Sequence, residues 1–286
     1  MTERERKWKR LRGMMGLALL LAALAGAFLL GTRWAAKEPA ERLPLAGRIV
    51  LLAGDSRSST DYTFYRQLLE KKSGCQVLVE GASGKTAAYN ASDAYFERLE
   101  QPHDFSLWLV GGNDPGEPGT VGTFSADSAL AEKGEPVVEE ADPAADLAEE
   151  TFIQSVDRIM RKYRERFYDF RTRDDGRRPI MIFCTDLPQQ RDGAESPWSQ
   201  KENWERKRLA ILECCEKNRV PCLDLYTLCG FDLSFEPFYT EPTDTETNRG
   251  LYYMDGLHPN REGFDRITSL EIAEMIRYGG FTESTP

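Results

Sequence analysis

The chain has 286 residues, of which 41% are hydrophobic, enough for one sizeable core and for one or two domains. Its formal net charge of −10 argues against a nucleic-acid-binding role. Only two histidines occur, His103 and His258, so a histidine-rich metal site is excluded and histidine-dependent chemistry has two candidates.

The N-terminal segment differs from the rest of the chain. Residues 1–13 carry six basic and two acidic side chains, and the nineteen residues 14–32 carry no charge. A helix of that length spans roughly 28 Å, enough to cross a bilayer core. Because basic flanks stay inside, we expect 1–13 to be a cytoplasmic tail, 14–32 a transmembrane anchor and 33–46 a linker to an extracytoplasmic domain. The alternative is a signal peptide cleaved near the small residues 23–25, which would release the domain as a secreted protein.

The six cysteines follow the spacing of neither a zinc site nor a dense disulfide framework. Cys184 and Cys222 lie in apolar runs, where buried thiols are typical. Outside the cytoplasm disulfides persist, so one oxidised pair is compatible with the sequence, although the spacing does not say which. The candidates for that pair are Cys214, Cys215, Cys222 and Cys229.

Apolar runs that end in Gly and polar residues alternate with segments of helical periodicity. Such alternation predicts a parallel sheet covered by helices on both faces, with the chemistry at the carboxyl ends of the strands. The predicted strands are 47–56, 75–84, 105–114, 178–188 and 220–226. The predicted helices are 61–72, 89–99, 147–167, 204–217 and 261–278.

Residues 115–146 interrupt this alternation with a stretch rich in Gly, Pro, Ala and acidic residues. The stretch is too long for an ordinary connection in a compact domain, so we interpret it as an insertion. A solvated acidic loop and a lid over an acyl pocket both fit this composition.

Three strands are expected to deliver polar residues to one edge of the sheet: Ser56, Gly84 and Asn113. Ser56 alone would also suit a helix N-cap. Asp255 and His258 lie three residues apart just before the last helix, where a turn can present both to the same edge. His258 can then take the proton of the Ser56 hydroxyl while Asp255 orients the imidazole. The Ser56 and Gly84 N–H groups and the Asn113 amide can stabilise the resulting oxyanion.

These segments resemble the four sequence blocks of the SGNH hydrolase family, also called GDSL-type esterases and lipases. The matching residues are Gly54-Asp55-Ser56, Gly84, Gly111-Gly112-Asn113-Asp114 and Asp255-Gly256-Leu257-His258, which occur in the family's order. The resemblance covers residues 48–278 and places an SGNH domain at 47–286. It implies a flavodoxin-like three-layer α/β/α sandwich with a five-stranded parallel sheet, here preceded by one N-terminal transmembrane helix. It also implies hydrolysis of esters or thioesters without a metal or an organic cofactor.

Two residues depart from the family pattern. Arg57 follows the nucleophile position, where the family usually has an aliphatic residue, and Lys85 follows the oxyanion glycine, where acidic or polar residues are common. One hypothesis is that both cations bind an anionic substrate. The alternative for Arg57 is an ion pair with Asp61 on the adjacent helix, at the (i, i+4) spacing.

Other polar residues receive structural or no roles. Asp55 is expected to support the turn and Asp114 to be a structural partner near the site. His103 is expected to be exposed and inert, and Asp186 and Asp224 receive no role. Four aromatic residues either line an acyl or sugar pocket or belong to the core: Phe231, Phe235, Phe238 and Tyr239.

The favoured function is an extracytoplasmic serine esterase that removes small acyl groups, chiefly acetyl, from a carbohydrate or other cell-surface substrate. A lipase, lysophospholipase or thioesterase is the first alternative. Acyl transfer to a wall polymer and a non-catalytic tethered module are the others. The expected partners are an acylated carbohydrate or lipid and the membrane, through the N-terminal helix, but no nucleic acid.

Overall fold

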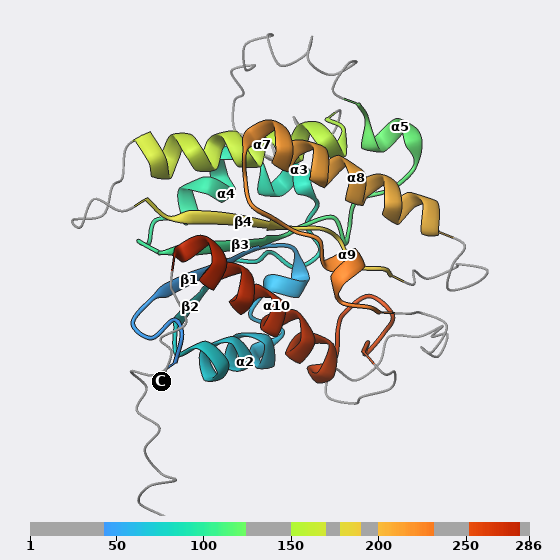
Figure 1. Ribbon diagram of the computed structural model, residues 1–286. Helices are drawn as coiled ribbons and strands as arrows, with labels where there is room; N and C mark the ends of the chain where they lie inside the picture. The colour runs from blue at the N-terminus through green and yellow to red at the C-terminus, as the bar shows by residue number, and fades with distance from the viewer. Residues whose placement is uncertain (1–42, 124–149, 170–177, 190–199, 232–251, 281–286) are drawn as a thin grey trace, which may run out of the picture. The chain divides into compact units, whose positions relative to one another are not determined.

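The computed structural model describes residues 43–123, 150–169, 178–189, 200–231 and 252–280 (Figure 1). From Pro44 onward, these residues belong to one compact unit. Within the described residues, five parallel strands form one sheet in the order β2-β1-β3-β4-β5. The strands are β1 (Ile49–Gly54), β2 (Gln76–Val79), β3 (Phe105–Leu109), β4 (Ile180–Cys184) and β5 (Cys222–Leu223).

Helices cover both faces of this sheet, which makes three layers (Figure 1). On one face lie α2 (Thr63–Ser73) and α10 (Arg261–Gly279). The other face is covered by α3 (Ala87–Asn90), α4 (Asp93–Arg98), α7 (Phe152–Arg164) and α8 (Lys201–Asn218). The remaining helices described are the 3₁₀ turn η2 (Ser56–Ser58), α5 (Pro118–Val121), the π-helical turn η3 (Glu165–Asp169) and α9 (Leu225–Leu228). The strand order and the two helical layers confirm the predicted flavodoxin-like sandwich.

The alternation of side chains along each strand explains why two helical layers are needed. In β1, Val50 and Leu52 pack into the core beneath α2 and α10, whereas Leu51 and Ala53 pack into the core beneath α7 and α8. Because successive residues of a strand point to opposite faces, an uninterrupted apolar run exposes apolar surface on both. Each face is therefore stable only when helices cover it.

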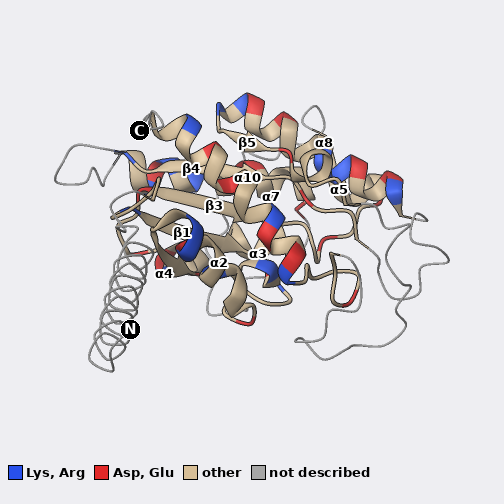
Figure 2. Cartoon of the chain, turned by 60° about the horizontal axis from the view of Figure 1, so that its bottom comes forward, with Lys and Arg blue, Asp and Glu red and all other residues tan. Residues whose placement is uncertain are grey.

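The outer helices carry charges of both signs, and the central strands carry none (Figure 2). On α8, Lys201 pairs with Glu205 and Arg206 pairs with Glu202, one helical turn apart. Such exposed pairs each contribute only about 0.3–0.5 kcal/mol, so the fold depends mainly on its two apolar cores.

Several element boundaries differ from the prediction. The helix expected at 89–99 is two short helices, because the Ser92 side chain accepts the Tyr95 N–H and starts α4 anew. The fifth strand is only two residues long, since the chain turns into α9 directly after Asp224. In the insertion expected at 115–146, residues 118–121 form α5, and residues 124–146 lie outside the described part.

All six cysteines are free thiols in the structure, so no pair of them forms the disulfide that the sequence left open. The thiol of Cys215 on α8 contacts that of Cys222 on β5, and this contact together with burial raises the pKa of Cys215 above its ordinary value. Within the described residues, no helix is long and apolar enough to cross a membrane. The anchor predicted at 14–32 lies outside them.

His103 is buried, contrary to the prediction that it is exposed. Its Nε2 lies 2.7 Å from the Tyr163 hydroxyl, and its Nδ1 lies 3.0 Å from the carbonyl of Gln101. The ring packs edge-on against Phe167. His103 precedes β3, at the amino end of the sheet, and so it has a structural role away from the carboxyl edge.

Candidate active site

Ser56 stands where β1 ends and η2 begins, at the carboxyl edge of the sheet. The residue before it, Asp55, caps this 3₁₀ turn by accepting the Arg57 N–H at 3.0 Å. Asp55 thus supports the turn, as predicted. The short turn holds Ser56 at the sheet edge with 9% of its surface exposed, a position from which its hydroxyl can reach a substrate.

Residues 252–260 form a closed loop that presents Asp255 and His258 together. Tyr253 and Pro259 make an antiparallel bridge, and the Met254 N–H donates to the His258 carbonyl at 2.9 Å. The Tyr253 hydroxyl also donates to the carbonyl of Pro188, which ties the loop to the segment after β4. The loop geometry therefore depends on contacts within the loop and with the sheet edge.

Ser56, His258 and Asp255 form a continuous hydrogen-bonded chain. The Ser56 Oγ lies 2.9 Å from the His258 Nε2, and the His258 Nδ1 lies 2.6 Å from the Asp255 Oδ2. The arrangement assigns the ring proton to Nδ1, because a carboxylate can only accept, and leaves Nε2 to accept from the serine hydroxyl. These are the distances expected between a nucleophile, a general base and its orienting acid.

Asp255 remains ionised in this setting. Burial by itself would raise the pKa of its carboxyl group, but hydrogen bonds from the His258 ring, the His258 N–H and the Leu257 N–H hold the pKa below its ordinary value. A carboxylate so held can stabilise the imidazolium that forms when His258 takes a proton.

Tyr62, which the sequence analysis did not single out, contacts the imidazole directly. Its ring stacks on that of His258, with centroids 4.8 Å apart, and it also packs against Phe264 of α10. Burial and the nearby charges of Asp255 and Asp61 raise the pKa of the Tyr62 hydroxyl above its ordinary range, so this residue stays neutral.

The three expected oxyanion donors lie on loops at this same edge. Ser56 begins η2, Gly84 follows β2 with a φ of +71°, and Asn113 follows β3. The Asn113 amide donates one hydrogen to the Lys85 carbonyl at 3.0 Å, which leaves its second hydrogen for another acceptor. The Lys85 contact also joins the loop that carries Asn113 to the one that carries Gly84.

A second set of contacts joins the Gly84 loop to the nucleophile turn. The Ser59 hydroxyl donates to the Asp61 carboxylate at 3.1 Å, and the Ser83 hydroxyl contacts both Ser59 and Asp61. Asp61 therefore bonds to these two serines. The predicted ion pair between Asp61 and Arg57 is not formed.

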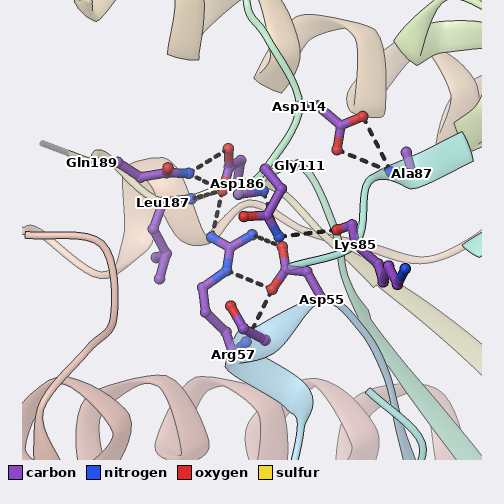
Figure 3. A network of polar contacts seen from close by, with 12 residues as sticks. Asp55, Arg57, Lys85, Ala87, Gly111, Asp114, Asp186, Leu187 and Gln189 are labelled. Carbon is purple, nitrogen blue, oxygen red and sulfur yellow. Dashed lines mark hydrogen bonds and ion pairs between the residues drawn. The ribbon is translucent and has the colours of Figure 1, made fainter. Parts of the chain in front are cut away.

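The structure overturns both expectations for Arg57. The side chain is fully buried, so it cannot meet a substrate, and its partners are Asp55 and Asp186 instead of Asp61 (Figure 3). The physical reason is the 3₁₀ turn, which directs residue 57 inward between the ends of β1, β3 and β4, where these two carboxylates lie. Burial would lower the pKa of the guanidinium, but the two carboxylates outweigh it and raise the pKa further.

Lys85 is exposed, and its Nζ lies 4.7 Å above the ring of Tyr89. Asp114 is a buried structural partner, as predicted, because its carboxylate accepts the Ala87 N–H at 3.0 and 3.1 Å and so begins α3. Burial raises its pKa to about 6. Of the aromatic group, Phe231 is buried and stacks on Tyr252, whereas the other three members lie outside the described residues.

Besides Tyr62, the sequence analysis missed the roles of Asp186 and Lys207 near the site. Asp186 follows β4 and accepts from Arg57 and Lys207, and these two charges lower its pKa to about 2 even though burial acts in the opposite direction. Asp186 lies at the end of a predicted strand, at the edge shared with Ser56, and this position could have identified it as a residue near the site. No signal marked Lys207, since a lysine within a charged helix is usually exposed.

The described residues contain no group of three His, Cys, Asp or Glu side chains arranged to hold a metal ion. The hydrogen-bonded Ser56, His258 and Asp255 at the sheet edge suit acyl transfer through a serine nucleophile.

The sequence profile of the GDSL-like lipase/acylhydrolase family matches residues 51–266, well over half of the chain. The chain belongs to this family. SGNH membership makes it a hydrolase and agrees with the four blocks found in the sequence. No curated protein matches the chain.

Solved structures support the same fold. A protein from Lactobacillus plantarum is 17% identical, with a TM-score of 0.55 over 82% of this chain and 98% of that one. A structure described as a possible lipase from Chitinophaga pinensis is also 17% identical, with a TM-score of 0.54 over 82% of this chain and all of the other. At this level of identity the likeness concerns the fold alone.

Proposed function

We propose that this SGNH hydrolase is a serine esterase with Ser56 as nucleophile, His258 as general base and Asp255 as the acid that orients it. The observation that carries the proposal is the hydrogen-bonded chain Ser56–His258–Asp255, with links of 2.9 and 2.6 Å, at the carboxyl edge of the sheet. A serine hydroxyl is a weak nucleophile until an adjacent base accepts its proton.

The reaction follows from the placement of these groups. The Ser56 Oγ attacks the ester carbonyl as its proton passes to the His258 Nε2, and the imidazolium is stabilised by Asp255. The oxyanion of the tetrahedral intermediate accepts from the Ser56 and Gly84 N–H groups and the free Asn113 amide hydrogen. His258 then protonates the leaving alcohol. Water, activated by the same histidine, releases the acid from the acyl-enzyme.

The substrate we propose is a small acyl ester, chiefly acetyl, on a carbohydrate or another cell-surface molecule. The charge pattern of residues 1–32 supports an extracytoplasmic domain held by a single membrane anchor. Protease treatment of intact and lysed cells tests this location, because an extracytoplasmic domain is digested in both.

Chain-length preference tests the substrate. The full chain in mild detergent is assayed on p-nitrophenyl esters from acetate to palmitate, with Ser56→Ala as the control. Preferential turnover of the acetate ester, abolished in Ser56→Ala, is the expected result. Preference for palmitate would favour a lipase, and the absence of Ser56-dependent turnover on every ester would overturn the proposal.

Lys85 is the remaining cation proposed to bind an anionic substrate. Its exposure near the Asn113 amide supports this role, and its position over Tyr89 gives the ammonium group a fixed place. Lys85→Glu should lower kcat/KM for acyl esters that carry a carboxylate more than for neutral ones. An equal change for both would remove Lys85 from substrate binding.

A further inference from the structure

Four charged side chains are buried together near the loop that carries Asn113, and Figure 3 labels three of them, Arg57, Asp55 and Asp186. They are Arg57, Asp55, Asp186 and Lys207, each at most 1% exposed, and they come from η2, the end of β1, the segment after β4 and α8. The two cations balance the two carboxylates. Removing one member would leave a buried charge without its partner, which is strongly destabilising.

Arg57 joins two of these segments with its guanidinium. Its Nε donates to the Asp55 Oδ1 at 3.0 Å and its Nη2 to the Asp55 Oδ2 at 2.5 Å, while its Nη1 donates to the Asp186 Oδ1 at 2.5 Å. The two bonds to Asp55 use the planar fork that only arginine has, so a lysine could not replace them.

Asp55 and Lys207 of this cluster hold the Asn113 loop. The Asp55 Oδ2 accepts the Gly112 N–H at 3.0 Å, and the Lys207 Nζ donates to the Gly111 carbonyl at 2.6 Å. A Cβ on Gly112 would lie 2.9 Å from that Asp55 oxygen and 3.0 Å from the Arg57 Nη2, so the glycine permits the close approach. The backbone on the amino side of Asn113 is thus fixed against buried charges.

Stability alone gives no reason for this arrangement. Well-packed apolar residues often replace buried ion pairs at no cost, so the stability of the fold does not require charges at these positions. What the charged cluster adds is a rigid hydrogen-bonded path of two links, from Arg57 to Asp55 and from Asp55 to Gly112. This path connects the turn that carries Ser56 to the loop that carries Asn113.

We propose that Arg57 is a positioning residue, which holds the Asn113 amide at the oxyanion position relative to Ser56 by acting through Asp55 and Gly112. The inference rests on the proposed esterase function. It predicts that Arg57 affects the transition state, where the oxyanion exists, and not the binding of the ground-state ester.

A double-mutant cycle tests the path. On p-nitrophenyl acetate, Arg57→Met in the full chain should lower kcat about 10- to 100-fold and change KM less than about twofold. Asn113→Ala should cost about 100-fold in the native background but only about 1- to 10-fold in Arg57→Met, because the amide there is already misplaced. The inference is overturned if Asn113→Ala lowers kcat equally in both backgrounds. It is also overturned if Arg57→Met changes only KM.

Arg57→Met leaves two carboxylates short of a partner, so Arg57→Lys serves as a second variant that keeps the charge and loses the fork. Arg57→Lys should lower kcat less than Arg57→Met does. Asn113→Ala should again cost less in the Arg57→Lys background than in the native chain. Arg66→Met is the matched control, because Arg66 makes an exposed pair with Glu70 and should leave both constants unchanged. Thermal unfolding of each variant shows that the chain is folded under the assay conditions.

Inactivation by a small fluorophosphonate separates this inference from the proposed function, since it needs Ser56 and the oxyanion donors but no particular ester. Slower, non-additive inactivation in the Arg57 and Asn113 variants supports the inference even when no tested ester is turned over. Additive effects overturn the inference and leave the esterase intact. A native chain that does not react at all overturns both.

Discussion

The ring of Tyr62 lies over the imidazole of His258, with the two planes inclined by 26°. Tyr62 precedes α2, and His258 lies in the loop before α10, so this contact joins the two helices of one layer at the edge where Ser56 stands. A stacked ring limits rotation of the imidazole and stabilises its cationic form.

We expect Tyr62→Ala to lower kcat for p-nitrophenyl acetate about 5- to 10-fold, the equivalent of about 1–1.5 kcal/mol of lost stacking. Tyr62→Phe keeps the ring and should retain nearly full activity. Tyr278→Ala removes a half-exposed tyrosine at the end of α10 and is the control. Equal losses in Tyr62→Ala and Tyr62→Phe would show that the hydroxyl, and not stacking, is what matters.

Removing the side-chain oxyanion donor should affect kcat almost alone. Asn113→Ala is expected to reduce kcat about 100-fold, because one donor in such a site contributes roughly 3 kcal/mol to the transition state. Asn113→Asp keeps the size of the side chain but places a negative charge beside the oxyanion, so its loss should be at least as large. Retention of activity in Asn113→Asp would contradict the role in oxyanion binding.

Asp255→Asn tests the orientation of the base. The variant can keep its hydrogen bonds from the Leu257 and His258 N–H groups, so the loop should remain folded. An amide cannot stabilise the imidazolium, and kcat should fall by about 10³- to 10⁴-fold. Asp265→Asn, a change at a half-exposed carboxylate on α10, should be neutral. If Asp255→Asn retains more than a tenth of the native kcat, the triad is the wrong description.

Glu271 makes stability depend on pH. It is fully buried in α10 beside Tyr65, and burial raises its pKa from 4.5 to about 7, although the Tyr65 hydrogen bond acts in the opposite direction. The folded state thus holds a proton that the unfolded chain releases near pH 4.5. Its contribution to stability is fully present below that pH and is lost as the pH rises through 7.

Glu271→Gln removes this titration and keeps an acceptor for the Tyr65 hydroxyl. Its melting temperature relative to the native chain should therefore increase between pH 4 and pH 8, with a difference in free energy of about 3 kcal/mol at the upper end. Glu262→Gln, at an exposed position of the same helix, should show no such trend. A difference in melting temperature that does not change with pH would contradict the buried titration.

The sequence was sufficient for the sheet and for the residues at its edge. The first three strands are apolar runs that end in Gly and polar residues, so alternation and topology predicted that Ser56, Gly84 and Asn113 share one edge. Ser56, Asp255 and His258 also lie in sequence blocks that match those of the SGNH family in order, and this match predicted their roles. The extent of the elements was less predictable, because a single side-chain hydrogen bond at Ser92 divides what periodicity reads as one helix.

The main error of the sequence-based prediction concerned which polar and charged side chains are buried. Arg57 was expected either to bind an anionic substrate or to pair with Asp61 on the adjacent helix. Its burial depends on Asp55 and Asp186, and the latter is 129 residues away in the chain. His103 was misplaced for the same reason, since its partner Tyr163 lies 60 residues further along. A local pattern does not reveal a compensating partner that only the folded chain brings near.

Ser56 and His258 lie 202 residues apart in the chain, so their hydrogen bond forms only when α10 has packed beside α2. Contacts between such distant segments form late, because the entropy of ordering the intervening chain must first be overcome. On refolding, helix content should thus recover before reactivity of Ser56. The reactivity of Ser56 therefore reports complete folding, and a partly folded chain does not attack esters.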